Sequence, residues 1–260
     1  MQVPPDHLTP EQAAAALAWL ADMGAGEIVG EHPVNRLKAQ LPAPAIISTA
    51  PPESRPRRND GGMEIDACRT LDDIVAALSA FDACPLKKTA TNLCFADGNP
   101  AARVMLVGEA PGRDEDLAGK PFVGRSGQLL DRMLAAIGLS RTSPDRDSAV
   151  FITNTIFWRP PGNRTPTEAE TQMCLPFLLR AIAIQNPDFI VCAGGTPAQR
   201  LTGRGEGILK TRGKWTDIIV SGRKIPLLPV LHPAYLLRQP AHKRLAWRDL
   251  LSLRQALDAR

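Results

Sequence analysis

The feature that most constrains the fold of this chain is a regular alternation between short β-prone apolar runs and longer amphipathic segments. The apolar runs cover 104–108, 149–155, 188–193 and 225–231, and the segments with helical periodicity cover 126–137, 167–185, 196–202 and 241–258. Strands that alternate with helices usually pair in parallel, because each helix carries the chain back to the start of the next strand. The pattern therefore predicts an α/β fold, a three-layer α/β/α sandwich with a mainly parallel central sheet.

The N-terminal part has a different character. Thr9 followed by Pro10 and an Ala-rich stretch predicts a short helix over 9–23, and residues 41–62 are rich in Pro, Ala, Ser and Arg. Such a composition buries too little apolar surface to become ordered. We therefore expect a partly disordered N-terminal extension over 1–66 and one main domain over 67–260.

The distribution of charge points to a polyanionic partner. The net charge of the 260 residues is only +4, but residues 200–260 carry 13 Lys and Arg against 4 Asp and Glu. Clustered cations attract nucleic acid by neutralising phosphates and releasing counterions. A solvated helix face is the alternative interpretation of the same charges.

Cysteine usage and hydropathy indicate a cytoplasmic protein. The five cysteines are an odd number, and the chain starts without a basic and apolar leader, which argues against a disulfide framework. Reduced thiols or metal ligands remain open. No run approaches the roughly 18 apolar residues of a membrane span. We expect a soluble protein of the cytoplasm, associated with the nucleoid if it binds DNA, and no membrane partner.

Polar residues follow each apolar run, where an α/β sheet places its ligand crevice. The segments at these strand ends are Gly108-Glu109-Ala110-Pro111-Gly112, Asn154-Thr155, Gly194-Gly195-Thr196 and His232-Pro233-Ala234-Tyr235. The first could bring backbone amides close to a ligand, but it is neither a Walker A sequence nor a dinucleotide fingerprint.

Three longer segments carry a family resemblance. Residues 108–130 (GEAPGRDEDLAGKPFVGRSGQLL), 154–166 (NTIFWRPPGNRTP) and 232–238 (HPAYLLR) resemble, in the right order, the motifs of family 4 (type A) uracil-DNA glycosylases. The resemblance covers roughly 67–258. It implies a base-excision repair hydrolase that cleaves the N-glycosidic bond of deoxyuridine in DNA, releasing uracil and leaving an abasic site.

The resemblance assigns base recognition to two side chains. Phe122 matches the aromatic that stacks on the flipped base, and Asn154 matches the amide that reads its Watson-Crick edge, since an amide both accepts and donates. A core aromatic and an Asn that caps a strand end are the structural alternatives. Glu109, Ala110 and Gly112 complete the expected substrate-binding set.

Catalysis is assigned to a carboxylate and a histidine. Glu115 corresponds to the water-activating carboxylate, with Glu109 as a competitor that the family pattern favours for shaping the loop. His232 matches the donor that stabilises the uracil anion as it leaves. Together with Asn154, these residues form the expected catalytic set.

The C-terminal segment is expected to hold DNA. Tyr235, Leu236, Leu237 and Arg238 suit a wedge that fills the gap left by the flipped base. The phosphate contacts are expected from Lys243, Arg244 and Arg159, with Arg164, Arg212 and Arg248 as possible extensions of the surface. The partner is DNA containing uracil, single- or double-stranded, and the protein is expected to be a monomer.

The cysteines depart from the family pattern, which implies a [4Fe-4S] cluster held by four thiolates. Cys84 and Cys174 occupy matching places, but Phe81 and Trp158 stand where the other two cysteines belong. Two large apolar side chains in place of two thiolates suggest a packed plug, so we expect no cluster. The alternative is a cluster that recruits Cys68 or Cys94.

Two other functions compete with the glycosylase. One is a non-catalytic or altered-specificity DNA-binding relative of the same superfamily. The other is a hydrolase acting on free nucleotides, which leaves the C-terminal cations and the wedge segment unexplained.

Overall fold

The computed structural model describes residues 65–259. The predicted helix over 9–23 and the Pro-rich segment over 41–62 lie outside the described residues. Ile65 and Cys68, at the start of the described residues, are buried in the core. None of the described helices is long and apolar enough to cross a membrane.

The described domain is built on a six-stranded sheet with the order β1-β3-β2-β4-β6-β5. Its strands are β1 (Ala96–Gly98), β2 (Val104–Gly108), β3 (Val150–Asn154), β4 (Phe189–Ala193), β5 (Thr216–Val220) and β6 (Arg223–Val230). The four central strands are parallel and correspond to the four apolar runs, while β1 and β5 pair antiparallel at the two edges. The prediction of a mainly parallel sheet is confirmed.

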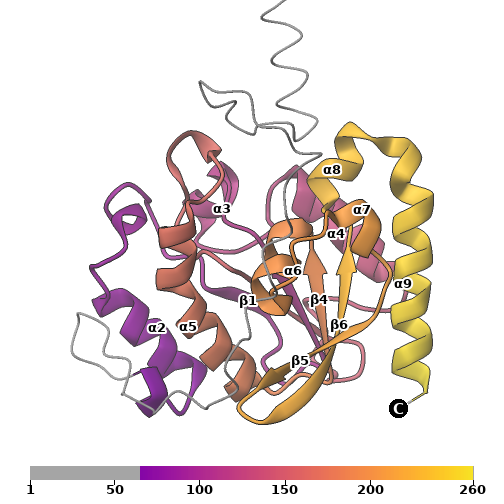
Figure 1. Ribbon diagram of the computed structural model, residues 1–260, viewed down its shortest axis with the longest axis horizontal. Helices are drawn as coiled ribbons and strands as arrows, with labels where there is room; N and C mark the ends of the chain where they lie inside the picture. The colour runs from indigo at the N-terminus through magenta and orange to yellow at the C-terminus, as the bar shows by residue number, and fades with distance from the viewer. Residues whose placement is uncertain (1–64, 260) are drawn as a thin grey trace, which may run out of the picture. The chain divides into compact units, whose positions relative to one another are not determined.

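Helices cover both faces of this sheet, as Figure 1 shows for α5 and α9 on opposite sides. The helices are α2 (Leu71–Ala80), α3 (Arg113–Ala118), α4 (Arg125–Ala135), α5 (Glu168–Gln185), α6 (Gly195–Thr202), α7 (Ile208–Thr211), α8 (Pro233–Arg238) and α9 (Lys243–Asp258). Successive side chains of β2 point to opposite faces: Met105 packs in the core with α2 and α5, and Leu106 packs in the core with α4 and α9. The three-layer prediction is therefore confirmed.

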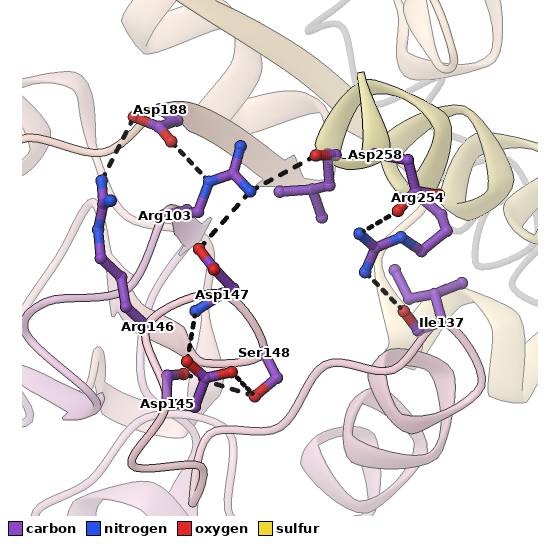
Figure 2. Close-up of polar contacts among 10 residues, drawn as sticks. Arg103, Ile137, Asp145, Arg146, Asp147, Ser148, Asp188, Arg254 and Asp258 are labelled. Atoms are coloured by element: carbon purple, nitrogen blue, oxygen red, sulfur yellow. Dashed lines mark hydrogen bonds and ion pairs between the residues drawn. The ribbon is translucent and has the colours of Figure 1, made fainter. Parts of the chain in front are cut away.

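Ion pairs link residues that flank the amino ends of the strands (Figure 2). Arg103 precedes β2 and pairs with Asp188, which precedes β4, at 2.7 Å, and with Asp147 at 3.7 Å. Arg146 adds a second contact to Asp188 at 3.7 Å. The charged side chains at this end of the sheet therefore pair with one another and stabilise the fold.

Candidate active site at the carboxyl ends of the strands

A cavity of about 610 Å³ opens beyond the carboxyl ends of the four parallel strands. It is lined from all four strand ends: Glu109, Ala110 and Gly112 follow β2, Asn154 ends β3, Gly194 and Gly195 follow β4, and Leu231 and His232 follow β6. Glu115, Phe122, Tyr235 and Arg238 also line it. The structure thus brings together the residues that the sequence singled out at separate strand ends.

The side chains of Phe122 and Asn154 both pack closely against Gly108. A Cβ atom at Gly108 would lie 2.5 Å from the Phe122 ring and 2.3 Å from the Asn154 Oδ1 atom. Only glycine fits here without displacing one of the two side chains. The Phe122 ring also stacks on His232, with the ring centroids 5.5 Å apart and the planes inclined by 28°. Gly108 is a site residue whose role the sequence did not reveal.

The Asn154 side chain has a hydrogen-bond acceptor that is unsatisfied within the described part of the chain. Its Oδ1 atom is buried and has no hydrogen-bond partner among the described residues. A buried oxygen left without a partner costs roughly 1–3 kcal/mol, so such atoms mark places where a ligand supplies the partner. The Asn154 amide is therefore suited to receive an N–H group in the cavity.

The His232 ring is held as a neutral donor. His232 is the N-cap of α8, and its Nδ1 atom accepts a hydrogen bond from the Ala234 N–H at 3.0 Å. In a neutral imidazole the proton then lies on Nε2, which can donate. Burial, aided by the Arg238 charge, lowers the pKa of His232 to about 4, so the ring is neutral at physiological pH.

The carboxylate of Glu115 is held by backbone amides. Glu115 occupies the third position of α3, where Oε2 accepts from the Gly112 N–H at 3.1 Å and Oε1 accepts from the Val123 and Gly124 N–H groups at 3.0 Å each. A Cβ atom at Gly112 or at Gly124 would crowd the carboxylates of α3. Glu115 thus ties the start of α3 to the loop that carries Phe122.

Glu109 is the second carboxylate of the cavity and has a different environment. Burial raises the pKa of Glu109, while a hydrogen bond from Thr196 and the charge of Arg200 act in the opposite direction. No backbone hydrogen bond to its carboxylate is found in the described part of the chain. This carboxylate is available to a ligand or a water molecule in the cavity.

The wedge prediction needs a correction at one position. Leu236 is fully buried against Leu129, Leu231 and Ala246, so its side chain cannot enter DNA. The reason is that 233–238 forms α8, which turns Leu236 into the core. In contrast, Tyr235 lines the cavity, Leu237 is partly exposed and Arg238 is exposed at its rim.

Tyr235 is fixed in place by a neighbour. Its ring stacks on the His242 ring with centroids 5.5 Å apart, and the Tyr235 hydroxyl lies 2.6 Å from His242 Nδ1. This pairing joins α8 to the start of α9. The stacking and the hydrogen bond to His242 together fix the position of the Tyr235 ring at the cavity.

The cations expected to contact DNA fall into two groups. Lys243, Arg244 and Arg248 are exposed on α9 and form no ion pair with a described residue, which fits phosphate binding. Arg212 instead forms a buried ion pair with Asp249, and its suggested role on the surface is wrong.

The two arginines of the loop after β3, Arg159 and Arg164, also form contacts within the protein. Arg164 makes a two-pronged contact with Glu170 at 2.6 and 2.9 Å, which lowers the pKa of Glu170 to about 2. Arg159 donates to Asn163 Oδ1 at 2.7 Å. Both arginines therefore order this loop, whose residues Pro160 and Asn163 line the cavity.

Two further lining residues were not anticipated. Ser126 lies in the first turn of α4, and Ile208 begins the short helix α7. Ser126 lies within the segment 108–130 that carries the family resemblance, but the sequence assigned it no role. Nothing in the sequence marked Ile208, because α7 follows a Gly-rich stretch without helical periodicity.

Away from the cavity, two cysteines and two aromatics pack together between α2 and α5. Cys84, Cys174, Phe81 and Trp158 are all buried, and the Phe81 and Trp158 rings stack with centroids 6.5 Å apart. The Cys174 thiol hydrogen bonds to Cys84, which lowers the pKa of Cys84 to about 7 and raises that of Cys174. We call these four residues the aromatic plug.

The plug does not provide the ligands of a [4Fe-4S] cluster. Such a cluster takes four thiolates, whereas only Cys84 and Cys174 meet here. Within residues 65–259, no three His, Cys, Asp or Glu side chains are grouped so that they could hold a metal. Cys94 instead donates to the Glu115 carbonyl oxygen at 3.0 Å, and Cys68 accepts from Arg180 through its carbonyl oxygen.

Comparison with known proteins places this arrangement in a family. Residues 95–251 match the family model of the uracil DNA glycosylase superfamily. Type-4 uracil-DNA glycosylases from Archaeoglobus fulgidus and Thermotoga maritima are 41% identical over 175 residues and 42% identical over 162 residues. The matched parts cover 66% of this chain and 85% of the first relative, and 62% of this chain and 80% of the second. The chain therefore belongs to the uracil-DNA glycosylase superfamily.

Proposed function

We propose that this protein is a type-4 uracil-DNA glycosylase that hydrolyses the N-glycosidic bond of deoxyuridine in DNA, releasing uracil and leaving an abasic site. Its relatives carry that name, and the geometry of the cavity supports the same chemistry. In this proposal the enzyme acts as a monomer on DNA in the nucleoid. The observation that carries the proposal is the buried, unpartnered Oδ1 atom of Asn154.

Base recognition follows from the orientation of the Asn154 amide. Uracil offers an N3–H donor beside the O4 acceptor, so Oδ1 accepts from N3–H while Nδ2 donates to O4. Cytosine presents an unprotonated N3 beside an amino group, which leaves Oδ1 facing an acceptor. Phe122 supplies the face on which the flipped ring stacks.

His232 stabilises the departing base. As the bond between C1′ and N1 breaks, negative charge spreads over N1 and O2 of uracil, and a donor aimed at O2 becomes more favourable in the transition state than in the ground state. The neutral His232 ring, with its proton on Nε2, supplies such a donor.

The attacking water is assigned to Glu109. The prediction that Glu115 activates the water is open, but three backbone amides already hold the Glu115 carboxylate. Glu109 lines the same cavity without such contacts, and burial that raises its pKa makes it a stronger base. In the proposed step the water oxygen bonds to C1′ as its proton passes to Glu109.

DNA binding involves the rim and the exposed face of α9. Tyr235, Leu237 and Arg238 stand beside the cavity, and Lys243 and Arg244 continue from them along the first turn of α9. Flipping the base costs a few kcal/mol and costs least when no pairing partner has to be lost, so single strands are the easier substrate.

We further propose that the aromatic plug replaces the family's iron-sulfur cluster as the support between α2 and α5. The stacked Phe81 and Trp158 rings and the presence of only two neighbouring thiols support this assignment. The chemistry at the cavity needs no redox step, because glycosidic hydrolysis exchanges one bond for another without electron transfer.

The test is uracil release from a labelled single-stranded oligonucleotide, detected as alkali-labile cleavage. The wild type should cleave at uracil and leave cytosine and thymine intact. Glu109→Gln should lower the single-turnover rate by about 10²-fold or more with oligonucleotide binding retained. Glu115→Gln should instead lower the melting temperature, because an amide nitrogen would then face backbone N–H groups. Binding without cleavage by the wild type would favour the non-catalytic relative.

A further inference from the structure

Phe122 has a backbone conformation that a bulky side chain rarely adopts. Its φ angle is +54°, in the left-handed region, and the other non-glycine residues of the described chain with positive φ are Asn163, Asn186 and Ser221. Asn tolerates this region through its short polar side chain, whereas an aromatic does not. The surrounding structure must therefore impose the conformation, as is typical of strained residues at functional sites.

Two charged side chains hold the peptide units on either side of Phe122. On the C-terminal side, the Glu115 carboxylate accepts from the N–H groups of Val123 and Gly124. Arg141 contacts both peptide units: it donates through Nη1 to the Pro121 carbonyl oxygen, on the N-terminal side, at 3.0 Å and through Nη2 to the Phe122 carbonyl oxygen, on the C-terminal side, at 2.8 Å. The guanidinium thus spans two consecutive carbonyls.

Arg141 is itself fixed by two carboxylates. Its Nη1 atom donates to Asp97 Oδ2 of β1 at 3.2 Å, and its Nε atom donates to Asp131 Oδ1 of α4 at 2.8 Å. The side chain is only 10% exposed and does not line the cavity. Such a guanidinium fork is rigid, and a lysine ammonium cannot reproduce its fixed geometry.

The Phe122 carbonyl is also confined from the side of α4. A Cβ atom at Gly127 would lie 1.8 Å from the Phe122 oxygen, so this carbonyl packs directly against the helix backbone. The oxygen is therefore enclosed by Gly127 and Arg141, and the ring of the same residue stacks on His232.

From these contacts we infer that Arg141 is a positioning residue for base recognition, acting through the strained backbone of Phe122. This inference rests on the proposed function, because Phe122 stacks on uracil only if uracil enters the cavity. Arg141 holds the backbone that places the Phe122 ring in the cavity that the Asn154 amide also lines. Loosening these contacts lets the backbone relax and lowers the fraction of molecules in which the ring is already placed to stack on the base.

The experiment compares Arg141→Lys with Arg103→Lys. Arg103 is a matched control: its side chain is 11% exposed and also pairs with two carboxylates, Asp188 and Asp147, but at the opposite end of the sheet (Figure 2). We expect Arg141→Lys to lower kcat/KM for uracil excision about 10-fold and to weaken binding of free uracil, measured by calorimetry, by a similar factor. Arg103→Lys should change both by less than 2-fold.

A double-mutant cycle separates positioning from general stabilisation. In a Phe122→Leu background, Arg141→Lys should have less than a 2-fold effect, because the ring through which Arg141 acts is gone. An undiminished 10-fold effect in that background, or an equal loss in Arg103→Lys, would overturn the inference.

Failure of the proposed function has a different signature. If the wild type excises no uracil from DNA, that proposal fails, and binding of free uracil then decides the inference alone. Binding that weakens in Arg141→Lys and not in Arg103→Lys sustains it. Wild-type excision with an unaffected Arg141→Lys variant contradicts the inference and leaves the proposed function standing.

Discussion

The cavity and the aromatic plug differ in how many residues of the family pattern each of them retains. In the cavity, every residue expected to contact the base lies in the lining, and the Asn154 Oδ1 atom has no partner among the described residues. In the plug, Phe81 and Trp158 stand where two thiolates are expected, and the space between α2 and α5 is filled by side chains. Chemistry at the base requires particular functional groups, whereas support between two helices requires only filled volume.

The largest effect is expected in the cavity, from Asn154→Asp. The substitution keeps the shape but puts a second acceptor where the amide nitrogen donates to O4, and we expect uracil excision to fall by about 10²–10³-fold. Single-turnover cleavage of a uracil oligonucleotide measures the loss. A rate within 3-fold of wild type would remove Asn154 from base recognition.

His232 provides the next test, through pH. Because its pKa is lowered to about 4, the ring stays neutral from pH 8 to pH 5, so protonation of His232 should not change the single-turnover rate over that range. Protonation begins to matter only as the pH falls toward 4. His232→Ala should lower the rate by about 10²-fold throughout the range. A wild-type rate that changes near pH 6.5 and becomes flat in His232→Ala would contradict the neutral-donor role.

In the plug, a large substitution should affect stability and spare chemistry. Trp158→Ala removes a fully packed ring and should destabilise the domain by about 3–5 kcal/mol, measured by denaturant unfolding. Below the unfolding transition, its excision rate should stay within about 3-fold of wild type. A loss of activity as large as that of Asn154→Asp would show that the two regions are not separable.

The smallest effect is expected on the rim cations. Lys243→Gln should weaken binding to an abasic-site oligonucleotide a few-fold and reduce the slope of log affinity against log salt by about 1. Lys224, which pairs with Asp217 at 2.9 Å in the edge hairpin, supplies the control. Equal effects of Lys243→Gln and Lys224→Gln would argue against a phosphate contact on α9.

The sequence predicts the central sheet, because its four buried parallel strands appear in the sequence as four apolar runs. It also predicts the location of the cavity, because the carboxyl ends of parallel strands lie together at one edge of the sheet. It does not predict the edge strands. β1 has three residues and no apolar pattern, and β5 depends on a hairpin through Ser221 and Gly222, both with positive φ. Short edge elements are set by pairing with neighbours more than by their own residues.

Individual side chains were less predictable where a distant partner decides their role. Arg212 resembles its exposed basic neighbours until Asp249, 37 positions later, pairs with it. Asp116, in the acidic first turn of α3, is buried and accepts from the Thr91 and Asn92 N–H groups, which lie more than 20 positions earlier in the chain. Periodicity also cannot distinguish Leu236 from Leu237 before the phase of α8 is known.

The most direct test of whether the aromatic plug has replaced the cluster measures iron and uracil excision in one preparation of the full chain, purified without oxygen and offered iron and sulfide. We predict efficient uracil release from a colourless protein with much less than one iron atom per chain. Stoichiometric binding of four iron atoms, with absorption near 400 nm and loss of excision when the iron is removed, would contradict the claim that the aromatic plug has replaced the cluster.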